Sequence, residues 1–441
     1  MANIKIKKGL DLNLEGAIAG TAMESVACKS FAVVPDDFTG VVPRLEVKEG
    51  DNVAAGDVLY HDKVYPEVKV TSPVAGRVAA IVRGERRKIE AIKIEADGSG
   101  KVKKFDIAGG DARSVLLESG LWCVMRQRPY DIVPNPAVAP RDIFVTAFDS
   151  APLAPDFTLL LKGKEKYLQK GIDVLASLTK GSVYLGCRPD WVPNVKGCIV
   201  NTFEGPHPAG NVGVQIANVK PVNKGEMVWT LDVVSVVRIG ELFSTGVVPF
   251  DTVVAVVGES VAKPHYAHCT MGCTVASLLG NGVVNPDNAR IVSGNLLTGS
   301  RVSADGYLRF PYRQLSVITE VRNNADFLGW ASLSPRRFSI YHSFTRWLLR
   351  GGTPAEVDAK INGGQRAIIM SGEYDRMLPM DILGEFLIKA IIAFDIDKME
   401  QLGIYEVAPE DFALCEFADT SKLPLQQIVR EGLDKLYKEM N

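Results

Sequence analysis

The chain has 441 residues, 46% of them hydrophobic and 23% charged, and a formal net charge of −2. This length predicts two to four domains of roughly 100–150 residues, and the near-neutral charge argues against a nucleic-acid binder, which requires a basic surface. We expect no transmembrane segment, because no apolar run approaches the roughly 20 residues that cross a bilayer, and seven widely spaced cysteines favour a reducing cytoplasm.

Residues 1–110 combine strand-like alternation with glycine turns. Apolar residues alternate up to a turn at Gly50, and a second turn at Gly56 returns the chain. The pattern is similar to the barrel-sandwich hybrid fold of lipoyl and biotinyl carrier domains. A carrier needs its modified lysine at an exposed hairpin tip, and the corresponding tip here, residues 61–66, contains Lys63. We favour an unmodified docking module, with a lipoylated Lys63 as the alternative.

Residues 111–250 alternate apolar strands with helical stretches, which predicts a Rossmann-like parallel α/β domain. The predicted elements are a buried strand at 143–148, an amphipathic helix at 164–179, and short strands at 181–186 and 198–202.

A dinucleotide-binding domain of this kind opens with a Gly-x-Gly-x-x-Gly loop, whose amides reach the pyrophosphate. The chain has no such run. The nearest counterpart is the glycine loop at 205–213, where Pro206 and Pro208 lack the amides that a phosphate would need. We therefore predict a sheet without a working dinucleotide site.

Residues 251–345 return to β-structure and predict a β-grasp domain of the ubiquitin-like (SLBB) type. The expected elements are a β-branched strand at 252–257, a short helix at 275–279, and strands at 290–294 and 315–319.

One cluster in this region has the residue types of a zinc site: His265, His268, Cys269 and Cys273. The spacing is unusual for zinc, and alternation along a strand would turn His268 and Cys269 to opposite faces. We predict no metal site here, although the sequence alone leaves metal binding by these residues open.

Residues 346–441 predict a C-terminal helical domain. A helix is expected at 380–394 with a buried face formed by Ile382, Leu383, Phe386, Leu387, Ala390 and Ile391. The last helix places on one face Leu425, Ile428, Val429, Leu433, Leu436 and Tyr437. Across the chain we find no Walker loop, nucleophile elbow, metalloprotease motif or cluster-binding cysteine run, and we predict no catalytic residues.

The C-terminal segment carries a family resemblance. Residues 370–392, 399–403 and 409–417 closely resemble the A subunit of the bacterial Na⁺-translocating NADH:quinone reductases, and a weaker resemblance extends over nearly the whole chain. It includes the loop at 207–210 and the strand at 290–294, in the family's order.

The resemblance implies a peripheral subunit on the cytoplasmic face of the bacterial inner membrane, with five other subunits as partners. In that family the partners carry FAD, FMN and the iron–sulfur cluster, so no cofactor is expected to be held firmly by this chain. It also implies a place near ubiquinone or menaquinone. No quinone motif can be carried over, and we name His207 and Gly210 as quinone-proximal candidates because a glycine loop lets a ligand approach the backbone.

Three other interpretations stay open. An Rnf-type electron-transport subunit shares the domain order but should carry two cysteine runs for clusters, whereas Cys415 is the only cysteine after Cys273. A carrier scaffold centred on Lys63 and a free-standing flavoprotein are the others. The isolated chain is expected not to be catalytic.

Overall fold

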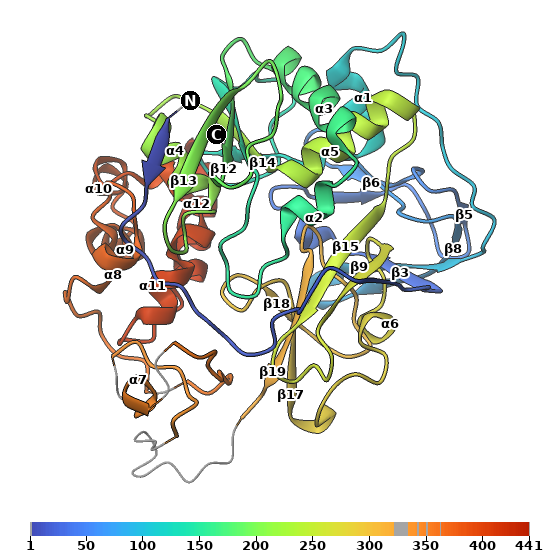
Figure 1. The fold of residues 1–441 in the computed structure, drawn as a ribbon. Helices are drawn as coiled ribbons and strands as arrows, with labels where there is room; N and C mark the ends of the chain where they lie inside the picture. The colour runs from blue at the N-terminus through green and yellow to red at the C-terminus, as the bar shows by residue number, and fades with distance from the viewer. Residues whose placement is uncertain (1, 322–333, 342–343, 350–351, 362, 441) are drawn as a thin grey trace.

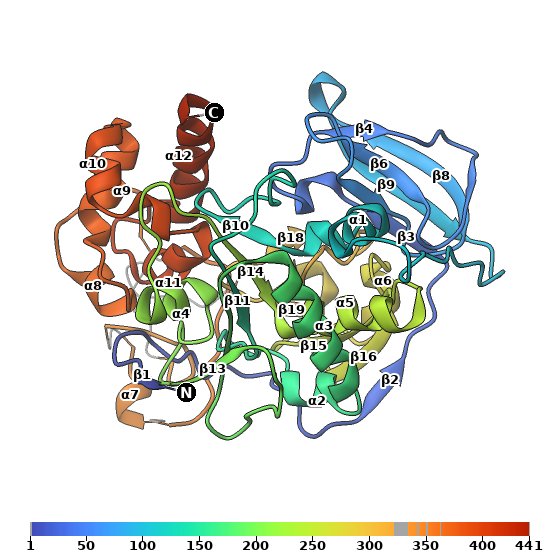
Figure 2. The ribbon, with the colours of Figure 1, turned by 90° about the horizontal axis from the view of Figure 1, so that it is seen from above.

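A computed structural model describes residues 2–321, 334–341, 344–349, 352–361 and 363–440. Parts of the two predicted C-terminal domains therefore lie outside the described residues: 322–333 and 342–343 of the β-grasp range, and 350–351, 362 and 441 of the helical range. Figure 2 shows the N-terminal barrel and the C-terminal helices at opposite ends of the molecule, with the α/β domain between them.

The barrel consists of a four-stranded and a three-stranded sheet. The first has the order β3 (Ser30–Val33), β9 (Ile89–Ala96), β8 (Gly76–Arg83) and β5 (Asn52–Val53); the second has the order β4 (Pro43–Leu45), β6 (Val58–Asp62) and β7 (Lys69–Thr71). Short 3₁₀ turns lie at η1 (Pro35–Asp37) and η2 (Glu85–Arg87). Gly50 and Gly56 both have φ of 94°, a conformation that explains glycine at the two predicted turns.

Two N-terminal strands leave this barrel. Strand β1 (Asn3–Lys5) pairs in parallel with β13 (Ile199–Glu204), and β2 (Met23–Ser25) pairs in parallel with β16 (His265–Thr270). The predicted 1–110 range assigned both segments to the first domain, whereas the structure adds them to the other two large sheets. Their partners lie about 200 and about 240 residues away in sequence, and such non-local pairing leaves no local signal.

The α/β domain contains a six-stranded sheet that is parallel except at one edge. Its order is β1, β13 (Ile199–Glu204), β12 (Val183–Cys187), β11 (Asp142–Thr146), β14 (Val228–Asp232) and the antiparallel β10 (Arg126–Arg128). The helical segments are α1 (Ala112–Ser119), η3 (Leu121–Val124), α2 (Phe157–Leu161), α3 (Glu165–Leu178), α4 (Val212–Val219) and α5 (Val233–Thr245). The predicted parallel unit, with its strand at 143–148 and helix at 164–179, is confirmed.

Helices cover both faces of this sheet (Figure 1). On β11, Ile143 and Val145 join the core that contains α3 and α5, whereas Phe144 between them packs with Ile216 of α4. This burial on both faces explains why β11 is a continuous apolar run.

Helices α3 and α5 cross closely through two glycines, Gly171 and Gly240. A Cβ atom on Gly171 would overlap the carbonyl oxygen of Val236, and one on Gly240 would overlap that of Tyr167. Glycine at both positions lets the two backbones come into contact.

The β-grasp sheet has the order β18 (Ser300–Val302), β17 (Ala289–Ser293), β19 (Gln314–Thr319), β15 (Asp251–Val257), β16 (His265–Thr270) and β2. The helical segments of this region are α6 (Val275–Leu279) and η4 (Pro286–Asn288). The predicted strands and the short helix are therefore all present.

The remaining helical segments are α7 (Arg346–Leu349), α8 (Glu373–Met377), α9 (Gly384–Ala393), α10 (Ile396–Gln401), η5 (Ile404–Glu406), η6 (Pro409–Phe412), α11 (Ala413–Ala418) and α12 (Leu425–Met440). They share a core with residues of β1, β13 and α4. None of the helices in the described residues is long and apolar enough to span a membrane.

The predicted buried face is confirmed for most of α12, where Leu425, Val429, Leu433 and Leu436 are fully buried. For α9 it was partly wrong, because Leu383 and Phe386 are 55% and 53% exposed. The helix begins at Gly384, after Leu383, and its buried face includes Glu385, whose Oε1 accepts the amide of Gly372 at 2.9 Å. The apolar periodicity could not predict the burial of Glu385, because this burial depends on a hydrogen bond.

Candidate functional site

A cleft of about 660 Å³ lies beyond the carboxyl ends of the parallel strands. In open α/β sheets, ligands bind at this edge, because loops and helix N-termini converge there. All four parts of the chain contribute to the lining, the barrel through Thr39. The other lining residues include Phe148 and Asp149 after β11, His207 and Gly210 between β13 and α4, Asp232 at the end of β14, Arg313 and Gln314 of the β-grasp region, and Glu410 and Arg430 of the C-terminal helices.

His207 is held in the wall of this cleft as a neutral imidazole. Its side chain is almost fully buried, and burial lowers its pKa to about 4. Nδ1 lies 3.0 Å from Ser150 Oγ, which itself accepts the amide of Gly210 at 2.8 Å. Because the Ser150 hydroxyl can either donate to Nδ1 or accept from it, this contact is compatible with both neutral tautomers. In either tautomer the neutral ring has one N–H donor and one acceptor nitrogen.

Gly210 has a packing role in the same loop. A Cβ atom there would lie 2.6 Å from the backbone nitrogen of Ser150. Its carbonyl oxygen accepts Thr146 Oγ1 at 2.9 Å, and its amide is bonded to Ser150. The structure thus brings both candidate residues together in the cleft, but the backbone that approaches Gly210 closely is the protein's own.

Further polar groups in the wall come from residues that the sequence did not single out. Arg313 Nη2 lies 3.0 Å from Asp232. Although burial opposes ionisation of Asp232, Arg313 and hydrogen bonds from Ser235 hold its pKa below the usual range. Arg313 Nε, Gln314 Oε1 and Arg126 Nη1 are buried and have no hydrogen-bond partner within the part of the chain that the structure describes. Unpaired groups of this kind are costly unless a ligand or water satisfies them.

The N-terminus of α4 is covered by a buried ion pair. Arg128 Nη1 lies 2.7 Å from Asp411 Oδ2, and both side chains are at most 1% exposed. The Asp411 carboxylate presses against the first turn of α4, where a Cβ atom on Gly213 would overlap it. Glu410 adds a second contact to Arg128 at 3.0 Å. A protein carboxylate thus lies where an α/β fold offers its amides and helix dipole to an anionic ligand.

The other residues considered in the sequence lie away from this cleft. Lys63 is exposed in the β6–β7 hairpin, where Asp62 accepts the amides of Val42 and Tyr65. On β16, His268 is exposed and Cys269 is buried, so they lie on opposite faces of the strand. No group of three or more histidine, cysteine or acidic residues suited to a metal occurs among the described residues.

The burial of His207 should make the stability of the folded chain more sensitive to acid. Between pH 6.5, the usual pKa, and about 4, the unfolded chain binds a proton at this position that the folded chain does not. This contribution to stability is complete above pH 6.5 and is lost as the pH falls toward 4, by up to about 3 kcal/mol. A His207→Gln chain should lose less stability than wild type between pH 7 and 4.5, as measured by urea unfolding midpoints. Equal losses in the two chains would contradict the assignment.

Family models described as the NqrA N-terminal barrel-sandwich hybrid domain, the NqrA second alpha/beta domain and the NQRA C-terminal domain match residues 4–97, 108–248 and 253–304. The chain is 34% identical to the A subunit of the Na(+)-translocating NADH-quinone reductase of Neisseria meningitidis serogroup B and 36% identical to that of Saccharophagus degradans. Each alignment covers 99% of this chain and 100% of the relative.

Among solved structures, an NAD⁺-reducing NiFe-hydrogenase in the air-oxidized state aligns with 68% of this chain and 55% of its own, at 13% identity and a TM-score of 0.36. A likeness this weak carries no argument about function.

The parallel sheet with a cleft at its carboxyl edge, joined to a barrel-sandwich module and a β-grasp sheet, defines a multidomain α/β protein with a ligand-sized site. The sequence matches extend over nearly the full length of the relatives. The chain belongs to the NqrA family, the A subunits of the Na⁺-translocating NADH-quinone reductases.

Proposed function

We propose that this chain is the peripheral A subunit of a complex that couples NADH oxidation and quinone reduction to Na⁺ export, and that its cleft holds the quinone ring beside His207. The observation that carries the quinone assignment is the neutral His207 imidazole in the wall of the cleft, which the Arg313 side chain also lines.

The cleft suits a ubiquinone or menaquinone ring in size and chemistry. Its volume of about 660 Å³ is within the range of small-molecule sites. A quinone ring is flat and presents two carbonyl acceptors, and the side chains of His207 and Arg313 are among the hydrogen-bonding groups that line the cleft. The aromatic side chains of Phe148, Phe310 and Tyr312 also line the cleft and offer surfaces for a flat ring.

An anionic cofactor is a poorer match to the same cleft. The Asp411 carboxylate lies at the N-terminus of α4, the position at which a flavin or nucleotide phosphate would bind. We therefore propose that this Rossmann-like domain holds neither FAD, FMN nor a nucleotide, and that the partner subunits carry the flavins and the iron–sulfur cluster. The isolated chain would then not be catalytic.

The family also supports a location and a domain plan. We propose that the chain docks on the cytoplasmic face of the bacterial inner membrane with five partner subunits. The domains would be a barrel at 1–110, a Rossmann-like domain at 111–250, a β-grasp domain at 251–345 and a helical domain at 346–441. Strands β1 and β2 of the first range are added to the sheets of the second and third domains.

A pair of His207 substitutions tests the quinone site. Asparagine retains a polar atom near the position of Nδ1 and so keeps the Ser150 contact, whereas glutamine reaches the position of Nε2. The His207→Asn chain should bind ubiquinone-1 about tenfold more weakly, the effect of one lost hydrogen bond, and the His207→Gln chain should stay within about threefold of wild type. Isothermal titration calorimetry of the full chain measures both. Saturable binding that is unchanged in both variants would place the quinone elsewhere, and no binding of ubiquinone-1 or a soluble menaquinone analogue by wild type would refute the proposal.

A further inference from the structure

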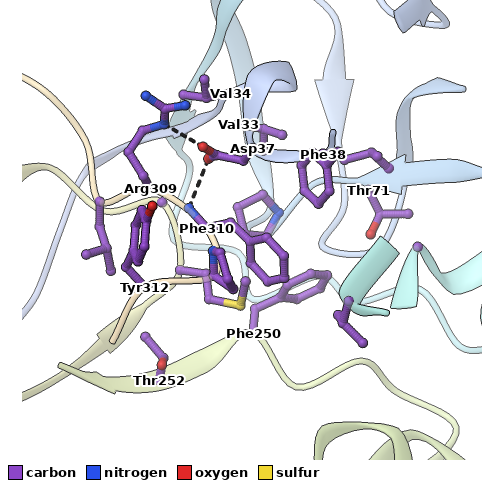
Figure 3. A pocket seen from close by; sticks show the side chains of 18 of the residues that line it. Val33, Val34, Asp37, Phe38, Thr71, Phe250, Thr252, Arg309, Phe310 and Tyr312 are labelled. Atoms are coloured by element: carbon purple, nitrogen blue, oxygen red, sulfur yellow. Dashed lines mark hydrogen bonds and ion pairs between the residues drawn. The ribbon is translucent and has the colours of Figure 1, made fainter. Parts of the chain in front are cut away.

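A second, smaller hollow lies next to the cleft, at the junction of three domains (Figure 3). Its volume is about 80 Å³. The barrel contributes Phe38, the α/β domain contributes Leu121 and Phe250, and the β-grasp region contributes Met271 and Phe310. We call this hollow the seam pocket. Most of the side chains that face it are apolar.

The polar side chains of the seam pocket are largely turned toward protein partners. The Asp37 carboxylate accepts Arg309 Nε at 2.6 Å and the Phe310 amide at 2.9 Å, the two contacts drawn in Figure 3. Thr71 Oγ1 donates to the carbonyl of Ser119 at 3.1 Å, and Arg238 donates to that of Asp251 at 3.2 Å. What remains for an occupant is mainly hydrocarbon surface, and apolar cavities of this kind bind apolar ligands in preference to water.

The seam pocket and the cleft have a common wall. The residues that line both hollows are Val124, Phe310, Pro311, Tyr312 and Arg313. Arg313 contributes the unpaired Nε to that wall, and Phe310 stacks on Phe38 of the barrel with ring centroids 5.2 Å apart. A polar hollow and an apolar hollow therefore adjoin across Val124 and the segment 310–313.

This adjacency matches a ligand with a polar ring and a branched apolar tail. Because one water needs roughly 10–15 Å³ on the same scale, the seam pocket has room for about five to eight atoms of that size. An isoprenoid unit has five carbons and no polar atom. A nucleotide or a sugar would instead bring hydroxyl or phosphate groups, for which the lining offers few free partners.

We propose that the seam pocket holds the first isoprenoid unit of the quinone, while the ring lies in the cleft. This inference rests on the proposed quinone site. The tail would pass the shared wall near Val124, and the three domains that form the pocket would together select prenylated quinones over tail-less ones.

The test compares ubiquinone-0, which has no tail, with ubiquinone-1, which has one isoprenoid unit. Burial of a five-carbon tail should tighten binding of ubiquinone-1 by about tenfold or more over ubiquinone-0 in the wild-type chain. Val33 lines the seam pocket but not the cleft, so Val33→Phe should fill the pocket and reduce this gain to less than about threefold, without weakening ubiquinone-0.

The matched control is Val42→Phe, the same substitution at a position of the barrel that is half exposed and lines neither hollow. It should keep the full gain. Thr252→Leu fills the pocket from the β-grasp side and serves as the second variant if Val33→Phe fails to fold, as judged by circular dichroism.

The outcomes separate the two proposals. If folded Val33→Phe or Thr252→Leu chains keep the wild-type gain for ubiquinone-1, the tail lies elsewhere and this inference is overturned, while the ring site stands. If wild type binds neither quinone, the quinone site itself fails and the inference fails with it. An equal loss of both quinones in the filled variants would also overturn the division into ring and tail sites.

Discussion

Replacing Asp411 by alanine should lower the free energy of unfolding by about 3–5 kcal/mol, the usual result of removing one partner of a buried ion pair. Arg128 is 1% exposed, and its Nη1 lies 2.7 Å from the Asp411 carboxylate. Without that carboxylate, the guanidinium stays in the interior, and its remaining partners among the described residues are the Glu406 carbonyl and Glu410. Urea unfolding followed by tryptophan fluorescence is a suitable measurement, because Trp122 and Trp229 are buried against each other in the α/β core.

Glu410 supplies the matched control, since it contacts the same guanidinium from the neighbouring position. Its side chain is 42% exposed, so solvent screens the interaction. Glu410→Ala should therefore cost less than about 1 kcal/mol. Similar losses for the two variants would show that burial does not decide the strength of this contact. A small loss for Asp411→Ala alone would mean that Arg128 finds another partner or water.

The fold was predictable where the signal is local. The helix α3 and the strand β11 follow from apolar periodicity within about 15 residues, and the structure contains both. The pairing of β1 with β13 was not predictable in this way, because three residues carry too little pattern to identify a partner about 200 positions away. The face of α9 was mispredicted because Glu385 is buried through a hydrogen bond that hydrophobic periodicity does not detect.

The residues of the candidate site also divide into those with a local sequence signal and those without one. His207 and Gly210 could be named because they lie in a glycine loop between a strand and a helix, a local feature with a known geometric meaning. Arg313 and Gln314 could not, since they reach the cleft from a different domain and their own sequence context indicates only a strand. Asp411 belongs to the segment that carried the family resemblance, yet its contact with the first turn of α4 appears only in three dimensions.

Replacing Gly240 by alanine should lower the free energy of unfolding by about 3 kcal/mol, because α3 and α5 cross closely at this glycine. A methyl group at Gly240 would overlap the backbone oxygen of Tyr167, and backbone cannot rotate away as a flexible side chain can. The two helices would have to separate, which loosens a core shared by Leu168, Ile172 and Val236. Alanine's better helix propensity, worth about 1 kcal/mol, opposes the effect without cancelling it.

Gly384 is the control that separates the steric cost of a methyl group at the helix crossing from the effect of alanine on helix propensity. It lies in the first turn of α9, where an added Cβ would meet Leu378, Phe412 and Tyr374 at ordinary contact distances of 3.4–3.5 Å. Gly384→Ala should therefore be neutral or stabilising by up to about 1 kcal/mol. The urea unfolding midpoints of the Gly240→Ala and Gly384→Ala chains, each compared with wild type, measure the two effects. A neutral Gly240→Ala would mean that α3 and α5 can shift apart at little cost, and that the contact between their backbones does not limit the stability of the chain.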